Sequence, residues 1–254
     1  MQSSHLFKRD AEGVPHIKIV IWGPSLAGKT SMLTVFNILK RIEDPELVYS
    51  ELKRIDDPSG RTIYYDQSIF ELPKGQGTSL PLLRYQVWTV AGQERHKDTR
   101  KIVIRGADGI IIMFDPTKEQ WEANKRSLLE LIELVGEELG TKIPFLVVVN
   151  KIDLPKEERT PTEEFMKLLV EVGLAKDIGE AYMKTLEISC LEARNDLLML
   201  PRRPDWRQLI DQNGRLKREA RPDSVRRVAQ PIEQITRMII EQKIKQHKAK
   251  PTQE

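Results

Sequence analysis

The sequence predicts an α/β protein of three layers, in which a mostly parallel sheet lies between helices on both faces. Three observations favour this fold class. Short apolar runs at residues 110–114 and 143–149 have the length and composition of strands that are buried on both sides. Segments with apolar residues three and four positions apart, typical of amphipathic helices, lie around them. The two kinds of segment alternate along the chain, as they do where crossover helices join parallel strands.

The first half of the chain begins with a tail of polar, aperiodic residues and then enters the alternating pattern. A loop is expected in the middle of this half, with room for a short helix, because Pro45, Pro58 and Gly60 lie there among charged residues. The expected elements are, in order, a strand at 17–22, a helix at 29–41, the loop at 43–60, and strands at 61–70 and 83–90, which are separated by a region rich in proline and glycine.

The second half continues the alternation and ends in a long helix. In that helix Val225, Val228, Ile232, Ile235 and Ile239 make one apolar face, and Pro231 is expected to kink the helix or to mark its true start. The earlier elements are a helical stretch at 94–105, a strand at 109–115, a helix from Trp121 to about residue 135, a strand at 143–149, a helix at 162–173 and a strand at 185–189.

The domain organisation follows from these elements. Eight arginines and lysines and three prolines interrupt the pattern at residues 191–222. We expect this arginine-rich insertion to be solvated and to form ion pairs with its own acids, Glu192, Asp196, Asp205, Asp211 and Glu219; a partner-docking role is the alternative. The expected parts are a flexible tail (1–15), the nucleotide-binding domain (16–190), the insertion (191–222), a helix that completes the domain (223–247) and a second tail (248–254).

Composition limits the classes of function. The chain has 254 residues, a net charge of +3 and a single cysteine. No apolar run approaches the ~20 residues that span a bilayer, and a small net charge does not favour nucleic acid as a partner. Lysines in the last residues allow peripheral membrane contact, but a solvated helix end is the usual explanation for such residues. These features predict a cytoplasmic protein.

A phosphate-binding loop is predicted between the first strand and the first helix. The segment matches the pattern G-x-x-x-x-G-K-T, in which glycines allow close backbone approach and successive N–H groups converge on phosphate. We expect Lys29 to reach the β- and γ-phosphates and Thr30 to ligate Mg²⁺. The residues expected to hold the nucleotide here are Gly23, Pro24, Ser25, Leu26, Ala27, Gly28, Lys29, Thr30 and Ser31.

A base-binding site is predicted at the end of the strand at 143–149. Asp153 can accept two hydrogen bonds from guanine N1–H and its 2-amino group, and adenine offers neither donor. This preference disfavours an ATPase. Asn150 is expected to bond the base edge and brace the loop, and the stem of Lys151 to cover the base face. Farther along, a backbone N–H is expected to meet guanine O6 in the segment made of Ser189, Cys190 and Leu191.

Together these residues resemble the Ras-like superfamily of small GTPases, over roughly residues 16–190 and again in the last helix. The superfamily has the P-loop NTPase fold. Within it, the middle of the chain looks most like the MglA group of bacterial and archaeal polarity GTPases. Residues 61–66, 89–93 and 100–109 carry this closer resemblance.

The resemblance implies roles for matching positions. Thr62 corresponds to the switch threonine that touches Mg²⁺ and the γ-phosphate, and Gly92 to the glycine whose N–H senses that phosphate. Gln93 corresponds to the residue that orients the attacking water, and Arg61 to an arginine finger supplied by the same chain. Thr89 stands where most Ras-like proteins have an aspartate that supports Mg²⁺, so the metal has one anionic partner fewer.

The expected function is a GTP/GDP switch that uses Mg²⁺ and hydrolyses GTP slowly without an activator. By resemblance, a roadblock-type (MglB-like) protein is the expected activator, and an effector protein is expected to bind the GTP state. The alternative is a scaffold that binds GTP with negligible turnover, for which Thr89 is the main argument.

Overall fold

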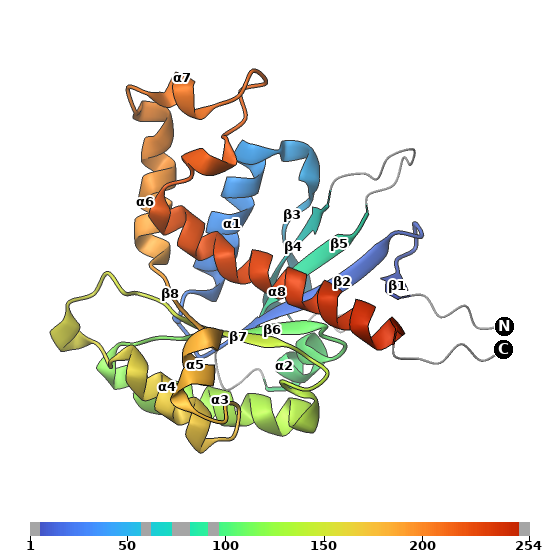
Figure 1. Cartoon of the computed structure of the whole chain (residues 1–254), viewed down its shortest axis with the longest axis vertical. Helices are drawn as coiled ribbons and strands as arrows, with labels where there is room; N and C mark the ends of the chain where they lie inside the picture. The colour runs from blue at the N-terminus through green and yellow to red at the C-terminus, as the bar shows by residue number, and fades with distance from the viewer. Residues whose placement is uncertain (1–5, 57–61, 73–81, 91–96, 249–254) are drawn as a thin grey trace.

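A central sheet organises the molecule (Figure 1). The computed structural model describes residues 6–56, 62–72, 82–90 and 97–248, and for 51–56, 62–65 and 97–99 it describes the backbone only. Within these ranges the sheet has the strand order β3-β4-β5-β2-β6-β7-β8, and β1 also pairs with β2. The strands are β1 (Lys8–Arg9), β2 (Pro15–Trp22), β3 (Val48–Asp56), β4 (Thr62–Glu71), β5 (Arg84–Thr89), β6 (Gly109–Phe114), β7 (Phe145–Val149) and β8 (Thr185–Glu187).

The sheet is mixed but mostly parallel. The strands β5, β2, β6, β7 and β8 run in one direction, and β4 and β3 complete the sheet as an antiparallel pair. Because β2 lies at the centre, the loop that follows it emerges beside the carboxyl ends of β5 and β6. Ligands bind at such an edge in open α/β sheets. The predicted fold class is confirmed.

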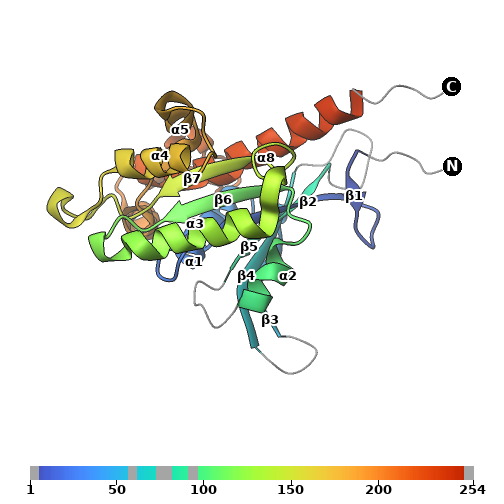
Figure 2. The same cartoon turned by 90° about the horizontal axis from the view of Figure 1, so that it is seen from below.

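Helices cover both faces of the sheet (Figure 2). One hydrophobic cluster unites the sheet with α1, α6 and α8, and a second unites it with α2, α3, α4 and α5. The helices are α1 (Lys29–Glu43), α2 (Lys97–Ile104), α3 (Trp121–Val135), α4 (Thr162–Glu171), α5 (Ile178–Lys184), α6 (Cys190–Met199), α7 (Trp206–Leu209) and α8 (Asp223–Lys248). The 3₁₀ turns are η1 (Pro45–Leu47), η3 (Lys118–Gln120), η4 (Gly136–Glu138), η5 (Lys156–Glu158), η6 (Leu200–Arg202) and η7 (Arg218–Ala220).

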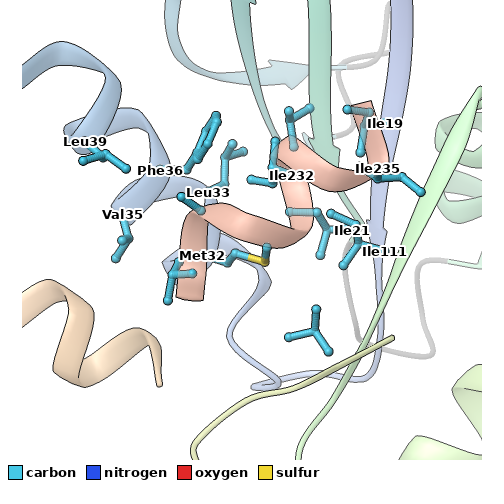
Figure 3. Close-up of a cluster of buried hydrophobic side chains, with 14 of the residues drawn as sticks. Ile19, Ile21, Met32, Leu33, Val35, Phe36, Leu39, Ile111, Ile232 and Ile235 are labelled. Atoms are coloured by element: carbon cyan, nitrogen blue, oxygen red, sulfur yellow. The ribbon is translucent and has the colours of Figure 1, made fainter. Parts of the chain in front are cut away.

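The first cluster fixes α1 and α8 against β2 (Figure 3). Ile19 and Ile21 project from β2 toward Ile232 and Ile235 of α8, and all four side chains are fully buried. On α1, Phe36 packs edge-on against Phe70 of β4, with ring centroids 4.9 Å apart. Burial of such apolar area is the main stabilising term in folding, so it holds the helix that follows the phosphate loop in place.

Within the predicted loop at 43–60, the described residues 43–56 differ from the prediction. They contain η1 and then β3, which pairs with β4 along the edge of the sheet through several register shifts. The charged residues of β3 hid the strand in the sequence. An edge strand has a neighbour on one side only, so its charges are compatible with solvent.

The amino-terminal segment also differs from expectation. Residues 6–15 are not a loose tail, because β1 pairs with the start of β2 as a hairpin. Asp10 holds the turn by accepting from the Val14 N–H at 2.9 Å, and it pairs with Arg84 of β5 at 2.7 Å.

The helix α5 was not predicted at all.

The arginine-rich insertion contains α6, η6, α7 and η7. Arg203 pairs with Asp205 as expected, but Arg215 pairs instead with Asp44 and Glu46, just after the end of α1. Arg221 likewise binds Glu43 of α1 through two nitrogens. The insertion therefore keeps an internal ion pair and is also docked on the main domain, through Arg215 and Arg221.

The last helix continues through Pro231, which lies inside α8 and is buried. The alternative that Pro231 marks the start of the helix is wrong, because α8 begins at Asp223. None of the helices in the described ranges is long and apolar enough to cross a membrane.

Candidate nucleotide-binding site

The predicted phosphate loop lies between β2 and α1, as the motif requires. Residues 23–28 form the loop, and Lys29, Thr30 and Ser31 are the first residues of α1. Gly23 passes so close to β6 that a Cβ there would lie 2.2 Å from the carbonyl oxygen of Met113. Leu26 is exposed and has a positive φ of 64°. The loop therefore wraps tightly around the start of the helix, where the helix dipole favours an anion.

Gly28 is required where the loop meets the predicted base site. Its φ is +100°, and a Cβ would lie 2.1 Å from the side-chain nitrogen of Asn150. The missing side chain lets the Asn150 amide donate to the Ala27 carbonyl oxygen at 2.8 Å. One buried hydrogen bond thus joins two motifs that are 123 residues apart in sequence.

The Lys29 side chain folds back onto its own loop. Its ammonium donates to the carbonyl oxygens of Gly23 (2.8 Å) and Pro24 (2.5 Å), and the residue is buried. Burial, and to a lesser extent the nearby Arg100, lower the pKa of Lys29 to about 7, and Asp66 opposes this shift. Anionic phosphates bound beside Lys29 would favour the charged form of its ammonium and so oppose this lowering of its pKa.

A carboxylate lies beside the first turn of α1. The Thr30 hydroxyl donates to Asp66 Oδ2 at 2.5 Å, and Asp66 projects from β4. The Thr89 hydroxyl, at the end of β5, also donates to Asp66 Oδ2 at 3.2 Å and accepts from the Asp66 N–H at 3.1 Å. Two hydroxyls thus orient this carboxylate toward the phosphate loop.

The predicted base-binding residues converge from two loops. Asn150 Oδ1 accepts from the Cys190 N–H at 3.0 Å, and Ser189 donates to the Asp153 carboxylate at 2.5 Å. The Asp153 side chain is exposed, whereas Asn150 and Ser189 are buried. The arrangement leaves a pre-oriented carboxylate facing solvent on a buried framework of hydrogen bonds.

Lys151 is anchored beside this framework. It adopts a positive φ of 58°, and its ammonium pairs with Asp115 at 2.5 Å. Asp115 is buried at the end of β6 and accepts from the Thr117 hydroxyl at 2.6 Å, while Asn124 of α3 holds its backbone. The ion pair fixes the direction of the lysine stem, as covering a flat ligand would require.

Comparison with known proteins agrees with this geometry. The model of the Ras family matches residues 61–194, more than half of the chain. The chain belongs to the Ras family. The mutual gliding-motility protein MglA of Myxococcus xanthus is 33% identical over 156 residues, which cover 60% of this chain and 74% of MglA.

Other Ras-type relatives match over different lengths. The Ras-related protein RABD2a of Arabidopsis thaliana is 27% identical over 218 residues, 85% of this chain and 92% of RABD2a. The human EF-hand calcium-binding domain-containing protein 4B is 32% identical over 144 residues, 57% of this chain but 17% of that longer protein. The chain is therefore a Ras-type small GTP-binding protein that is similar to MglA.

The structure describes the remaining predicted site residues of this Ras-family chain only in part. Thr62 is the first residue of β4, where its backbone pairs with Asp56, and its side chain is outside the description. Arg61, Gly92 and Gln93 lie outside the described residues. Leu191 lies at the exposed start of α6. Helix geometry leaves the first N–H groups of α6 without acceptors in the helix.

Three charged residues at this site were given no role in the prediction: Asp66, Asp115 and Arg100. Arg100 is buried in α2, where it pairs with Glu130 at 2.9 Å and stacks over Trp22. Asp115 directly follows a buried strand, a position that signals a site residue in α/β folds. Asp66 lies within a β-strand and carried no such signal.

Proposed function

We propose that this protein is a GTP/GDP switch that hydrolyses GTP to GDP with Mg²⁺ and binds partners according to the bound nucleotide. The observation that carries the proposal is the direct hydrogen bond from Asn150 to Ala27, which places the guanine motif beside the phosphate loop. A nucleoside phosphate has its base and its phosphates on the two sides of such a junction. Ras-family membership supports the same function.

Magnesium is proposed to bind beside Thr30. Its hydroxyl and the Asp66 carboxylate are oxygen donors of the kind that Mg²⁺ prefers. Among the described residues there is no group of three or more histidine, cysteine or acidic side chains that could hold a metal alone. The site therefore fits an ion held mainly by nucleotide phosphates and water, with Thr30 and Thr62 as proposed ligands. The bound ion would neutralise charge on the phosphates.

Asp66 is proposed to take over the task of the aspartate that Thr89 replaces. Its carboxylate is bonded to both threonine hydroxyls, so it lies between the proposed ligand and the substituted position. A carboxylate there can accept hydrogen bonds from metal-bound water. This arrangement favours GTP hydrolysis over the alternative of a GTP-binding scaffold. The carboxylate that is missing at Thr89 is supplied instead by Asp66 of β4.

For hydrolysis, we propose that Gln93 orients water, that Arg61 neutralises developing charge, and that Gly92 and Thr62 sense the γ-phosphate. Lys29 would hold the β- and γ-phosphates. The proposed hydrolysis is slow in the free protein. A roadblock (MglB-like) activator and an effector of the GTP state are the proposed partners, supported by similarity to MglA.

Single-turnover hydrolysis separates the switch from the scaffold. Protein loaded with GTP is mixed with Mg²⁺, and GDP formation is followed by chromatography. A measurable rate that collapses in Gln93→Ala supports the switch. A negligible rate that is unchanged by Gln93→Ala, with intact GTP binding, supports the scaffold.

A further inference from the structure

A hollow of about 500 Å³ lies away from the nucleotide site, along α8 and beside η7. The side chains of Arg226, Glu233 and Arg237 follow one stripe of α8, at helical spacing. The opposite stripe of α8 is buried against the sheet. Arg218 and Arg221, just before the start of α8, also line the hollow. We call this feature the four-arginine hollow.

Negative charge in the hollow is already shared among several cations. Glu233 is the acidic residue of its lining. Its carboxylate forms ion pairs with Arg218 at 2.9 Å, Arg221 at 3.0 Å and Lys40 at 3.2 Å. Glu43, which does not line the hollow, is bonded to Arg221 and Lys40. Two carboxylates thus serve three cations, which leaves this group of five side chains with a net positive charge.

Within the part of the chain that the structure describes, the other two arginines of the hollow, Arg226 and Arg237, have no close ion pair of their own. Arg226 lies 3.6 Å from Asp223, but that carboxylate lies closer to Arg227, at 2.8 Å. Arg237 is exposed and has no ion pair among the described residues. Their guanidinium groups can therefore turn to a ligand without breaking a buried pair.

We propose that the four-arginine hollow binds a phosphate monoester. Guanidinium groups form forked, charge-assisted hydrogen bonds with phosphate oxygens, and a tetrahedral dianion can accept from several arginines at once. The hollow has the volume of a small-molecule site. Met238 and the arginine stems supply apolar surface for the organic group of the ester. The inference does not depend on the proposed GTP hydrolysis.

The test measures binding of soluble phosphate esters to the full chain, saturated with GDP and Mg²⁺ so that the phosphate loop is filled. Calorimetry with inorganic phosphate and with glycerol phosphate is compared with acetate at equal ionic strength. A parallel flotation assay uses vesicles containing phosphatidic acid, with phosphatidylcholine vesicles as the reference. Binding of the soluble esters identifies a soluble ligand, and binding to phosphatidic acid alone identifies a lipid headgroup.

The variant Arg226→Gln/Arg237→Gln is matched by Arg202→Gln/Arg207→Gln, which removes the same charge from exposed arginines outside the hollow. We expect the first variant to weaken phosphate or vesicle binding by about tenfold or more, and the second to leave it within about twofold. Equal weakening by both variants, or no saturable binding in any arm, would overturn the proposal. Thermal melting confirms that each variant is folded.

Discussion

The Thr30 hydroxyl donates a 2.5 Å hydrogen bond to the carboxylate of Asp66. The two residues come from different elements, since Thr30 lies in the first turn of α1 and Asp66 in β4. The contact places a negative charge beside the proposed magnesium ligand. The sequence has Thr89 where most Ras-like proteins have an aspartate, and Asp66 supplies a carboxylate close to that position.

Replacing Asp66 with asparagine tests this role. Asp66→Asn removes the charge but keeps a hydrogen-bond acceptor near Thr30 and Thr89. We expect Mg²⁺ affinity in the nucleotide complex to fall by about 10-fold to 100-fold. The measurement is the release rate of a fluorescent GDP analogue as a function of Mg²⁺ concentration.

A second change provides the control. Adding Thr89→Asp to Asp66→Asn returns one carboxylate to the neighbouring strand, so part of the Mg²⁺ dependence should return. An Asp66→Asn protein whose release rate depends on Mg²⁺ as in the unmodified chain would refute the role of Asp66.

Gly28→Ala is expected to separate the phosphate loop from the base loop. The new Cβ would collide with the Asn150 amide and break its hydrogen bond to Ala27. The control is Gly173→Ala, where φ is +76° and nothing lies within 4 Å of the added carbon. That control incurs only the backbone strain of about 1–2 kcal/mol. GDP affinity should fall in Gly28→Ala and stay unchanged in Gly173→Ala; equal affinities would contradict the junction.

Cys190 should resist alkylation in the folded protein. Burial, together with the nearby Asp153, raises the pKa of its thiol to about 12. Because the folded state keeps the proton on sulfur, labelling at pH 8 should be at least about 100-fold slower than in denaturant. The rate should rise about tenfold per pH unit below that pKa. Since this is the only cysteine, total label incorporation measures it directly. Rapid native labelling at pH 8 would contradict the buried position.

Arg221 should contribute strongly to stability because it is buried between two carboxylates. Its side chain is 4% exposed and binds Glu43 and Glu233. Arg221→Ala would leave both acids without this partner, and such losses cost about 3 kcal/mol or more. Urea unfolding measures the change. Arg203→Ala, which removes an exposed pair with Asp205, should leave the unfolding free energy nearly unchanged.

The sequence predicted the elements that hold the site because their signals are local. The strand before Gly23, the helix after Gly28 and the buried strand before Asn150 each show their periodicity or apolar run within a short window. Burial on both sides makes such strands apolar throughout, so they are easy to recognise. The alternation of these elements was enough to predict the fold class.

The parts that were missed depend on contacts between distant residues. The strand β3 is charged, and only its pairing with β4 makes it a strand. The contact of Asp66 with Thr30 requires the register of β4 against β5, which periodicity does not give. The partners of Arg215 and Arg221 lie about 170 residues earlier, on and after the end of α1.

The central claim is that this site selects guanine, and a competition assay tests it most directly. The protein is loaded with a fluorescent GDP analogue, and GTP or ATP is then added in the presence of Mg²⁺. Because Asp153 can pair with two guanine donors that adenine lacks, we expect GTP to displace the analogue at equal concentration. ATP should fail to displace it even at about a hundredfold excess. Displacement by ATP and GTP at the same concentration would contradict the account.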